Sequence, residues 1–144
     1  MDAESPAAVF LDTNVLVYAF DRSAGRKHEL ARRLVEACWA NENGCMSVQV
    51  LQEFYVTVTR KIAAPLESLT ARQIVEDLSQ WRLHTPAAID LLQAIDLAQR
   101  FQVSFWDAQI LQSASSLGCR VIYSEDLSHG QQYGEVQVVN PFVE

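Results

Sequence analysis

The chain has few cysteines, no long apolar run and fewer basic than acidic side chains. Its three cysteines, Cys38, Cys45 and Cys119, are odd in number and show no Cys-x-x-Cys spacing. This pattern disfavours a disulfide framework and a structural zinc site, and it fits a reducing cytosol. No apolar run approaches the roughly 18 residues of a membrane span. The start Met-Asp-Ala-Glu lacks the basic residues of a signal peptide. We therefore expect a soluble, cytoplasmic protein without membrane contact.

Basic side chains are also unevenly placed along the chain. The 144 residues hold 11 Lys or Arg against 18 Asp or Glu, a net charge of -7, which disfavours nucleic-acid binding through charge alone. The first 72 residues hold 8 against 9, a net of -1, and the last 72 hold 3 against 9, a net of -6. A locally basic surface is therefore compatible with an acidic chain. Most basic residues of the first half are Arg22, Arg26, Lys27, Arg32, Arg33, Arg60 and Lys61.

Length and pattern predict one α/β domain. With 144 residues, 49% of them apolar, and no repeat or linker, residues 1–144 are expected to form a single domain. Short apolar runs predict strands at 9–11, 45–46, 81–84, 121–123 and 136–139, and apolar residues at helical spacing fill the segments between them. Thr70-x-x-Gln73 and Thr85-Pro86 predict two helix starts. Strands that alternate with helices predict a central parallel sheet of about five strands, flanked by helices on both faces.

Four acidic residues stand where predicted elements begin or end. Asp12 and Asp126 directly follow two predicted strands, and Glu53 and Asp107 lie early in two predicted helices. In a parallel sheet such strand ends converge at one edge, where ligands bind. Two unit charges about 4 Å apart repel by roughly 4 kcal/mol at an effective dielectric near 20. Gathered carboxylates must therefore raise their pKa values or hold a cation, and oxygen ligands favour Mg²⁺ or Mn²⁺ over zinc.

Each acid also has a purely structural interpretation. Asp12 suits the cap of the helix that follows it, and Ser104-x-x-Asp107 matches a capping box. Asp126 suits a turn in which it bonds its own backbone, and Glu53 suits a solvated helix face. Taken singly, each acid fits the structural role better, and only the four together favour a site.

The remaining polar and aromatic candidates receive structural interpretations. The three histidines show no ligand spacing and are expected on the surface, the tryptophans are expected mostly in the core, and the arginines between 22 and 33 are expected on a solvated helix face. These residues are His28, His84, His129, Trp39, Trp81 and Trp106.

The acidic motifs resemble those of a known family. Val9-Phe10-Leu11-Asp12-Thr13-Asn14 resembles the opening motif of the PIN-domain nucleases, and Val50-Leu51-Gln52-Glu53-Phe54 resembles the segment around their second acid. Phe105-Trp106-Asp107-Ala108 and Tyr123-Ser124-Glu125-Asp126-Leu127 resemble the third and last motifs. In order and spacing the four motifs span nearly the whole chain, whose length is similar to that of VapC toxins of bacterial toxin–antitoxin pairs.

The resemblance implies a PIN-like fold and hydrolysis of RNA phosphodiester bonds with Mg²⁺ or Mn²⁺. Asp12, Glu53, Asp107 and Asp126 would be the catalytic, metal-binding acids, and Thr13, Asn14 and Ser124 would hold a metal-bound water or the scissile phosphate. Glu125 beside Asp126 leaves two choices of ligand, of which the motif favours Asp126. Family likeness further implies an RNA substrate (tRNA, rRNA or mRNA), a homodimer, and a VapB-type antitoxin that lies along an apolar groove and reaches the site with a basic side chain.

Two other classes of function remain open. The segment around Asp12 faintly resembles the nucleophile motif of haloacid-dehalogenase-type phosphatases, but Asn14 stands where those enzymes usually have a second Asp, and no lysine follows Lys61. A non-catalytic module that binds RNA or protein is the third reading. It has to explain why an acid cluster is kept, since such a cluster is costly to folding unless a cation serves it.

Overall fold

The computed structural model describes residues 6–143, and within this range one six-stranded sheet runs through the molecule. Its order is β3-β2-β1-β4-β6-β5. The neighbours from β3 to β6 are parallel, and β5 is antiparallel to β6. The five predicted strands are confirmed, and β5 is an addition, because two residues are too few to show a strand pattern. The strands are β1 (Val9–Leu11), β2 (Gly44–Ser47), β3 (Arg82–His84), β4 (Val121–Tyr123), β5 (Gln132–Tyr133) and β6 (Val136–Val139).

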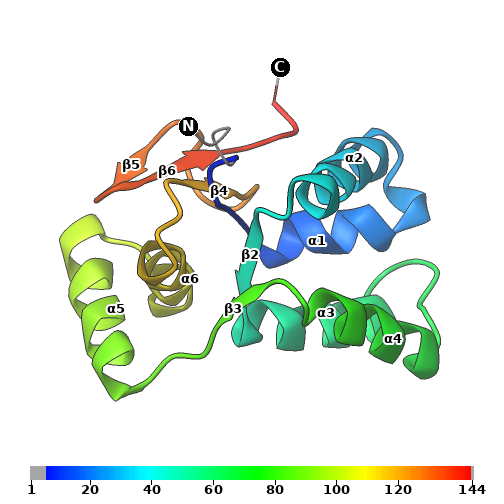
Figure 1. Cartoon of the computed structure of the whole chain (residues 1–144), viewed down its shortest axis with the longest axis horizontal. Coiled ribbons are helices and arrows are strands. Elements are labelled where there is room, and N and C mark those ends of the chain that lie inside the picture. Colours follow the sequence, from blue (N-terminus) through cyan, green and yellow to red (C-terminus); the bar gives the residue numbers. More distant parts are fainter. Residues whose placement is uncertain (1–5, 144) are drawn as a thin grey trace, which may run out of the picture.

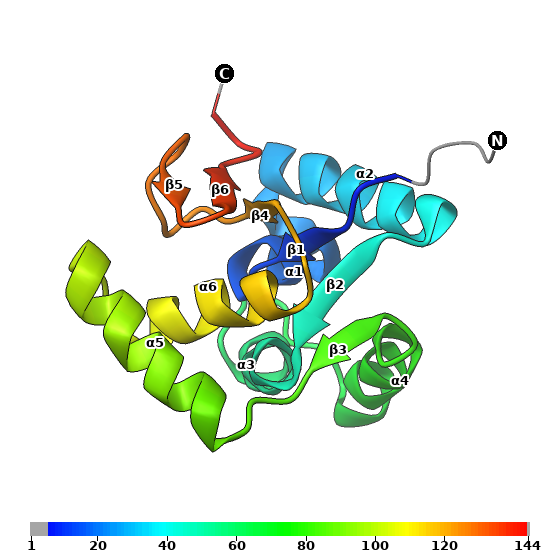
Figure 2. The same cartoon turned by 60° about the vertical axis from the view of Figure 1, so that its left-hand side comes forward.

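Helices lie on both sides of the strands, as the sequence predicts (Figure 1). The helices α1 and α2 lie on one side and α5 and α6 on the other, while α3 and α4 lie beneath α1; the turned view agrees (Figure 2). The helices are α1 (Thr13–Phe20), α2 (Arg26–Asn41), α3 (Val48–Arg60), α4 (Ser68–Leu78), α5 (Ala88–Phe101) and α6 (Phe105–Ser116), with a short 3-10 helix at Arg22–Ala24.

Two predicted helix starts are wrong by two or three residues. Thr70 lies inside α4, which begins at Ser68. The helix α5 begins at Ala88, not directly after Thr85, because the Asp90 carboxylate accepts a hydrogen bond from the Ala87 backbone N–H at 2.7 Å. The N-cap position is therefore Ala87, and the side chain that satisfies its backbone N–H comes from Asp90 in the first turn.

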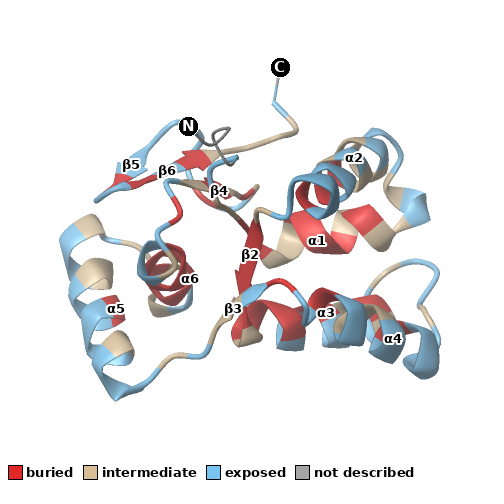
Figure 3. Cartoon of the chain, in the orientation of Figure 1, coloured by how far each residue is buried: buried red, intermediate tan, exposed pale blue. Residues whose placement is uncertain are grey.

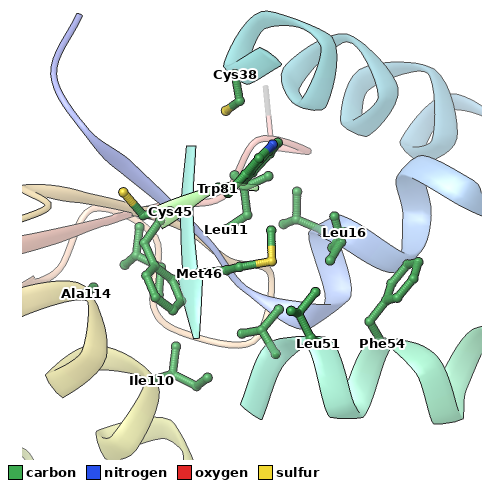
Figure 4. Close-up of a cluster of buried hydrophobic side chains, with 14 of the residues drawn as sticks. Leu11, Leu16, Cys38, Cys45, Met46, Leu51, Phe54, Trp81, Ile110 and Ala114 are labelled. Atoms are coloured by element: carbon green, nitrogen blue, oxygen red, sulfur yellow. The ribbon is translucent and has the colours of Figure 1, made fainter. Parts of the chain in front are cut away.

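The core forms where both helix layers meet the central strands. Side chains of β1, β2, α1, α3 and α6 converge there (Figure 4), and Phe10, Leu16 and Phe54 are fully buried. A Cβ atom on Gly44 would lie 2.5 Å from the ring of Trp81, so the start of β2 has room for glycine alone. Buried residues gather around the central strands, and the outer faces of α4 and α5 are exposed (Figure 3).

Of the three tryptophans, only Trp81 lies in the core. It is 8% exposed, whereas Trp39 and Trp106 are 42% and 62% exposed. The expectation that the tryptophans are mostly core residues is therefore wrong for two of them. Trp39 packs edge-on against Trp81 with ring centroids 5.5 Å apart, and Trp106 lies in the first turn of α6, where the helix faces solvent.

The sheet places the predicted site at the carboxyl ends of neighbouring strands. Leu11 of β1 pairs with Tyr123 of β4, so the next residues, Asp12 and Ser124, leave the sheet side by side. The Asp12 backbone N–H donates to the Tyr123 carbonyl at 3.0 Å. Next to β1, β2 leads directly into α3, whose N-cap Ser47 accepts a hydrogen bond from the Val50 N–H at 3.3 Å. The start of α3 therefore lies at the same edge, and Glu53 follows beyond the first turn of this helix.

Across residues 6–143, no helix is both long and apolar enough to traverse a membrane. The residues on which the signal-peptide expectation depends, 1–4, lie outside the described range.

Candidate active site

Asp12 forms the buried floor of the candidate site. It is the N-cap of α1, and the residue is only 6% exposed. Oδ1 accepts a hydrogen bond from the Thr13 backbone N–H at 2.7 Å, and Oδ2 accepts one from the Ser124 hydroxyl at 2.7 Å. The capping role is therefore real, and it holds the carboxylate at the end of β1.

Burial raises the pKa of the Asp12 carboxyl from 3.8 to about 6. The hydrogen bonds from Ser124 and Thr13 oppose this rise, and the negative charges of Asp126 and Asp107 add to it. Burial disfavours the charged form, and like charges nearby do the same. Three of the four predicted acids are therefore close enough to interact electrostatically.

Glu53 is linked to Asp12 through Thr13. The Thr13 hydroxyl donates to Glu53 Oε1 at 2.7 Å, while the Thr13 backbone N–H donates to Asp12. Glu53 itself is exposed, away from the buried side of α3. One threonine thus connects the first and second predicted acids, which are 41 positions apart in the sequence.

Asp107 is half-buried in the first turn of α6. Its backbone N–H donates to the Ser104 hydroxyl at 3.1 Å, which confirms Ser104 as the cap of this helix. Within the described part of the chain, the Asp107 carboxylate makes no hydrogen bond or ion pair, so its oxygens remain available to a ligand.

Ser124 organises the turn after β4. Its side chain is fully buried; the hydroxyl donates to Asp12 and accepts the backbone N–H groups of Asp126 and Leu127 at 3.2 and 3.4 Å. The structural role in this turn therefore belongs to the Ser124 side chain and not to Asp126. The expected contact of Ser124 with a phosphate or metal-bound water stays a prediction.

Glu125 and Asp126 have different surroundings. Glu125 forms an ion pair with Lys27 and accepts a hydrogen bond from the Tyr18 hydroxyl at 2.7 Å. Asp126 is exposed, and its carboxylate has no such partner among residues 6–143. The geometry therefore favours Asp126 as the member of the pair that is available to a cation.

Asn14 has a buried donor without a partner. Its Oδ1 accepts the Glu125 backbone N–H at 3.1 Å, but its buried Nδ2 atom has no hydrogen-bond partner within residues 6–143. Buried polar groups are nearly always satisfied, so an orphaned donor calls for an explanation. A ligand oxygen at this position would supply the missing acceptor.

A cleft of about 750 Å³ opens beside these residues. Its lining includes Thr13, Asn14, Glu53 and Asp126, and Lys61 is the one basic residue among the lining residues. The remaining lining is formed by Val17, Tyr18, Asp21, Gln52, Val56, Thr57, Ile62 and Ala63. The volume lies within the range of small-molecule and cofactor sites. Tyr18 is a cleft residue that the sequence did not indicate, because it lies within an apolar helical run.

The donor set suits a hard cation, although the side chains do not form a closed metal site. Within residues 6–143, no three His, Cys, Asp or Glu side chains are grouped as one metal ion would require. The candidate ligands are all carboxylate oxygens, as Mg²⁺ and Mn²⁺ prefer. One is buried with a raised pKa, and the orphaned Asn14 donor lies beside the same turn. The assignment of the four acids as metal ligands stays a prediction.

The structure tests the expectations that the histidines lie on the surface and that the arginines of α2 lie on a solvated helix face. His129 is exposed, but His84 is half-buried, with Nδ1 2.7 Å from the Ser113 hydroxyl and Nε2 3.4 Å from Asp90. His28 is also half-buried, with Nδ1 2.9 Å from the Tyr18 carbonyl. The surface expectation is thus wrong for these two. Arg32 forms ion pairs with Glu29 and Glu36 along α2, as expected for a solvated helix face.

Comparison with known families identifies the fold. The PIN domain model matches residues 9–132, and the chain belongs to the PIN domain family. The predicted PIN-like α/β architecture is therefore confirmed.

Solved structures of toxin–antitoxin proteins share this fold. A toxin–antitoxin complex from Klebsiella pneumoniae aligns with TM-score 0.69 and 20% identity over 94% of this chain and 98% of that chain. VapC20 of Mycobacterium tuberculosis, a sarcin–ricin loop cleaving toxin, aligns with TM-score 0.64 and 21% identity over 83% and 90%. DNA-bound VapBC from Salmonella typhimurium aligns with TM-score 0.62 and 21% identity over 92% and 97%. No curated protein sequence matches the chain.

Proposed function

We propose that this chain is a Mg²⁺- or Mn²⁺-dependent endoribonuclease that acts as the toxin of a VapBC-type pair. The observation that carries the proposal is the buried Asp12 carboxylate at the end of β1, whose pKa is raised by burial and by the charges of Asp126 and Asp107. Membership of the PIN domain family and the similar folds of VapC and VapBC proteins support it.

In this proposal each residue has a definite task. Asp12 and Asp107 are the principal cation ligands, and Glu53 and Asp126 complete the set or orient water. Ser124 and Thr13 hold Asp12 and Glu53 in place through the hydrogen bonds described above. Asn14 lines the cleft, and its buried Nδ2 donor, which has no partner within residues 6–143, would donate to a phosphate oxygen. A bound divalent ion would supply charge neutralisation for phosphate and a more acidic water.

The cation also explains how an acidic protein can hold RNA. Bound divalent ions reverse the local sign of charge, so a carboxylate site becomes attractive to a polyanion. Lys61 lies on the wall of the same cleft and has no side-chain ion pair in the described part of the chain. We assign it a contact with an RNA phosphate beyond the scissile one.

A VapB-type antitoxin is the proposed protein partner. An apolar groove of about 450 Å³ runs between α3 and α4. Its lining shares Gln52 and Val56 with the cleft, so an antitoxin segment in the groove would be continuous with the acids. A basic side chain from that segment would neutralise the site. The groove is lined by Val48, Leu51, Gln52, Tyr55, Val56, Arg72 and Val75.

The remaining assignments follow from the proposed class. We assign the activity to residues 1–144 as one domain, place the protein in the cytoplasm, where its RNA substrate and antitoxin would be found, and infer a homodimer. Exposed apolar side chains on α5 supply a surface for the second copy. The phosphatase alternative has no structural observation in its favour.

The proposal is tested by incubating purified protein with tRNA and rRNA in Mg²⁺, Mn²⁺ or EDTA. We expect cleavage that requires the divalent ion and falls more than roughly 100-fold in Asp12→Asn and Asp107→Asn, since loss of even an outer-shell metal partner costs 10–100-fold. Asp96→Asn is the matched control, because Asp96 is exposed on α5 outside the cleft.

Three results would contradict the proposal. Cleavage that persists in EDTA would exclude the cation-dependent mechanism, and full activity of Asp12→Asn would exclude the assigned site. Stable RNA binding without turnover under any divalent ion would instead favour a non-catalytic module.

A further inference from the structure

Glu125 lies next to the candidate acids but its charge is already paired. Lys27 on α2 forms an ion pair with Oε2, and the Tyr18 hydroxyl on α1 donates to Oε1 at 2.7 Å. Each carboxylate oxygen therefore has its own donor.

Aromatic packing closes the arrangement around Lys27. Its ammonium lies 5.1 Å from the centroid of the Tyr18 ring and 5.7 Å from that of Phe142. Tyr18 and Phe142 meet edge-to-face with centroids 5.2 Å apart. We call Tyr18, Lys27, Glu125 and Phe142 the Glu125 clasp. It joins α1, α2, the turn after β4 and the segment that follows β6.

The Glu125 clasp is directly connected to the candidate site. The Glu125 backbone N–H donates to Asn14 Oδ1 at 3.1 Å. Its neighbours in sequence are Ser124, which holds Asp12, and Asp126, which lines the cleft. Tyr18 lines the same cleft. A movement of Glu125 would therefore shift both an acid of the site and one wall of the cleft.

We propose that the Glu125 clasp is a positioning device for the acid site, in which Lys27 and Tyr18 hold Glu125 so that it fixes Asp126 and Asn14 rather than binding the cation itself. This inference rests on the proposed function, because it assigns a supporting role within that site. Lys27 neutralises what would otherwise be a fifth carboxylate charge near the cluster, and the cation is left to the other acids.

The first test is amide hydrogen exchange, which requires no activity. The backbone N–H groups of Glu125 and Asp126 are bonded to Asn14 and Ser124 side chains. We expect Lys27→Met and Glu125→Gln to speed their exchange by roughly threefold or more, as loss of a partly exposed ion pair allows. Arg32→Met is the matched control: Arg32 is 43% exposed against 44% for Lys27, and it also pairs with glutamate on α2. Unchanged exchange in both clasp variants would overturn the proposal.

The second test uses Mn²⁺ binding by titration calorimetry and RNA cleavage. We expect Lys27→Met and Glu125→Gln each to lower kcat by about tenfold, and their combination to add no more than about twofold, since both remove the same clasp. Tyr18→Phe, which deletes one hydroxyl, should give a smaller loss of the same kind. Arg32→Met should leave kcat unchanged.

A charge exchange separates positioning from direct ligation. In the clasp, Lys27→Glu with Glu125→Lys restores the ion pair, so the double variant should bind Mn²⁺ and cleave RNA better than Glu125→Lys alone. If Glu125 were a ligand, the double variant would be as defective as Glu125→Lys, and Glu125→Gln would lose as much Mn²⁺ affinity as Asp126→Asn. Either result would overturn the proposal. Absence of RNA cleavage by the wild-type protein would contradict the proposed function, while hydrogen exchange would still decide whether the clasp orders the turn.

Discussion

Asp12 is both the N-cap of α1 and the most buried of the candidate acids. At this residue, two contributions to the free energy of folding have opposite signs. Helix capping stabilises the chain whether the side chain is Asp or Asn, whereas burial of the charge opposes folding. Burial raises the pKa of Asp12 to about 6, although the hydrogen bonds from Ser124 and Thr13 oppose the rise.

The opposing contributions predict a pH-dependent effect of Asp12→Asn on stability. The folded chain binds the Asp12 proton more tightly than the unfolded chain, so this residue stabilises the fold below about pH 4, and the contribution is lost as pH rises through 6. A rise of about two pKa units corresponds to at most about 3 kcal/mol. In EDTA, urea unfolding should show that Asp12→Asn gains free energy of unfolding relative to wild type between pH 4 and 7. A difference that stays constant over this range would contradict the assignment.

Residue-level features of the site divide into those that sequence can and cannot predict. Asp12 and Asp126 directly follow β1 and β4, Asp107 lies in the first turn of α6, and Glu53 lies further inside α3. The parallel pairing of β1 with β4 brings the first two close together, and the shared role of all four stays a prediction. The contacts of the neighbouring Glu125 cannot be read from the sequence: Tyr18 and Glu125 are 107 positions apart, and no local pattern indicates that they touch. The same holds for His84, whose contacts with Ser113 and Asp90 come from three different elements.

At the scale of elements, α5 is the least buried of the α-helices in the described part of the chain. Of its residues only Ala94 is buried, and Ile89, Leu92 and Ile95 are 60%, 57% and 42% exposed. The helix packs against α6 on one side of the molecule (Figure 2). An exposed apolar face of this kind marks an interaction surface, which we assign to the proposed homodimer.

The proposed dimer predicts that Leu92→Glu yields a monomer. A carboxylate in an apolar interface loses its water without gaining a partner, which is costly. Size-exclusion chromatography with light scattering should show a dimer for wild type and a monomer for Leu92→Glu at the same concentration. Gln99→Glu, which adds the same charge at another exposed α5 position, serves as the control. A dimer that persists in Leu92→Glu would exclude this face.

The sequence predicts elements well where several apolar residues recur in a pattern. It predicts them poorly where one side chain determines the position at which an element begins. The apolar runs at β1 and β4 mark buried strands, because adjacent apolar residues need cover on both faces of a sheet. In β6 the exposed Gln137 separates the buried Val136 and Val138, which is the alternation of a strand with one exposed face. The start of α5 depends on one hydrogen bond between Asp90 and Ala87, which competes with the equally reasonable cap at Thr85. The strand β5 exists only through its pairing with β6.

For the whole molecule, the proposed cation links function to stability. A ligand that binds only the folded state stabilises it by about 2.7 kcal/mol at 100 times its dissociation constant. Mn²⁺ should therefore raise the melting temperature of the wild-type protein, and the rise should be reduced or absent in Asp12→Asn and Asp126→Asn. Differential scanning fluorimetry with Mn²⁺ or Ca²⁺, and Asp96→Asn as control, measures this. An equal rise in all variants would place the cation elsewhere.

The sheet ends at β3 on one side and at β5 on the other. These outer strands are three and two residues long, so each offers few unpaired backbone groups to a neighbouring molecule. Long, flat outer strands are the usual template for fibril growth, and short ones suppress it. At high concentration this fold should therefore resist open-ended growth by edge-to-edge strand pairing. Crowded molecules would instead contact one another through their helices, and such contacts form oligomers of limited size.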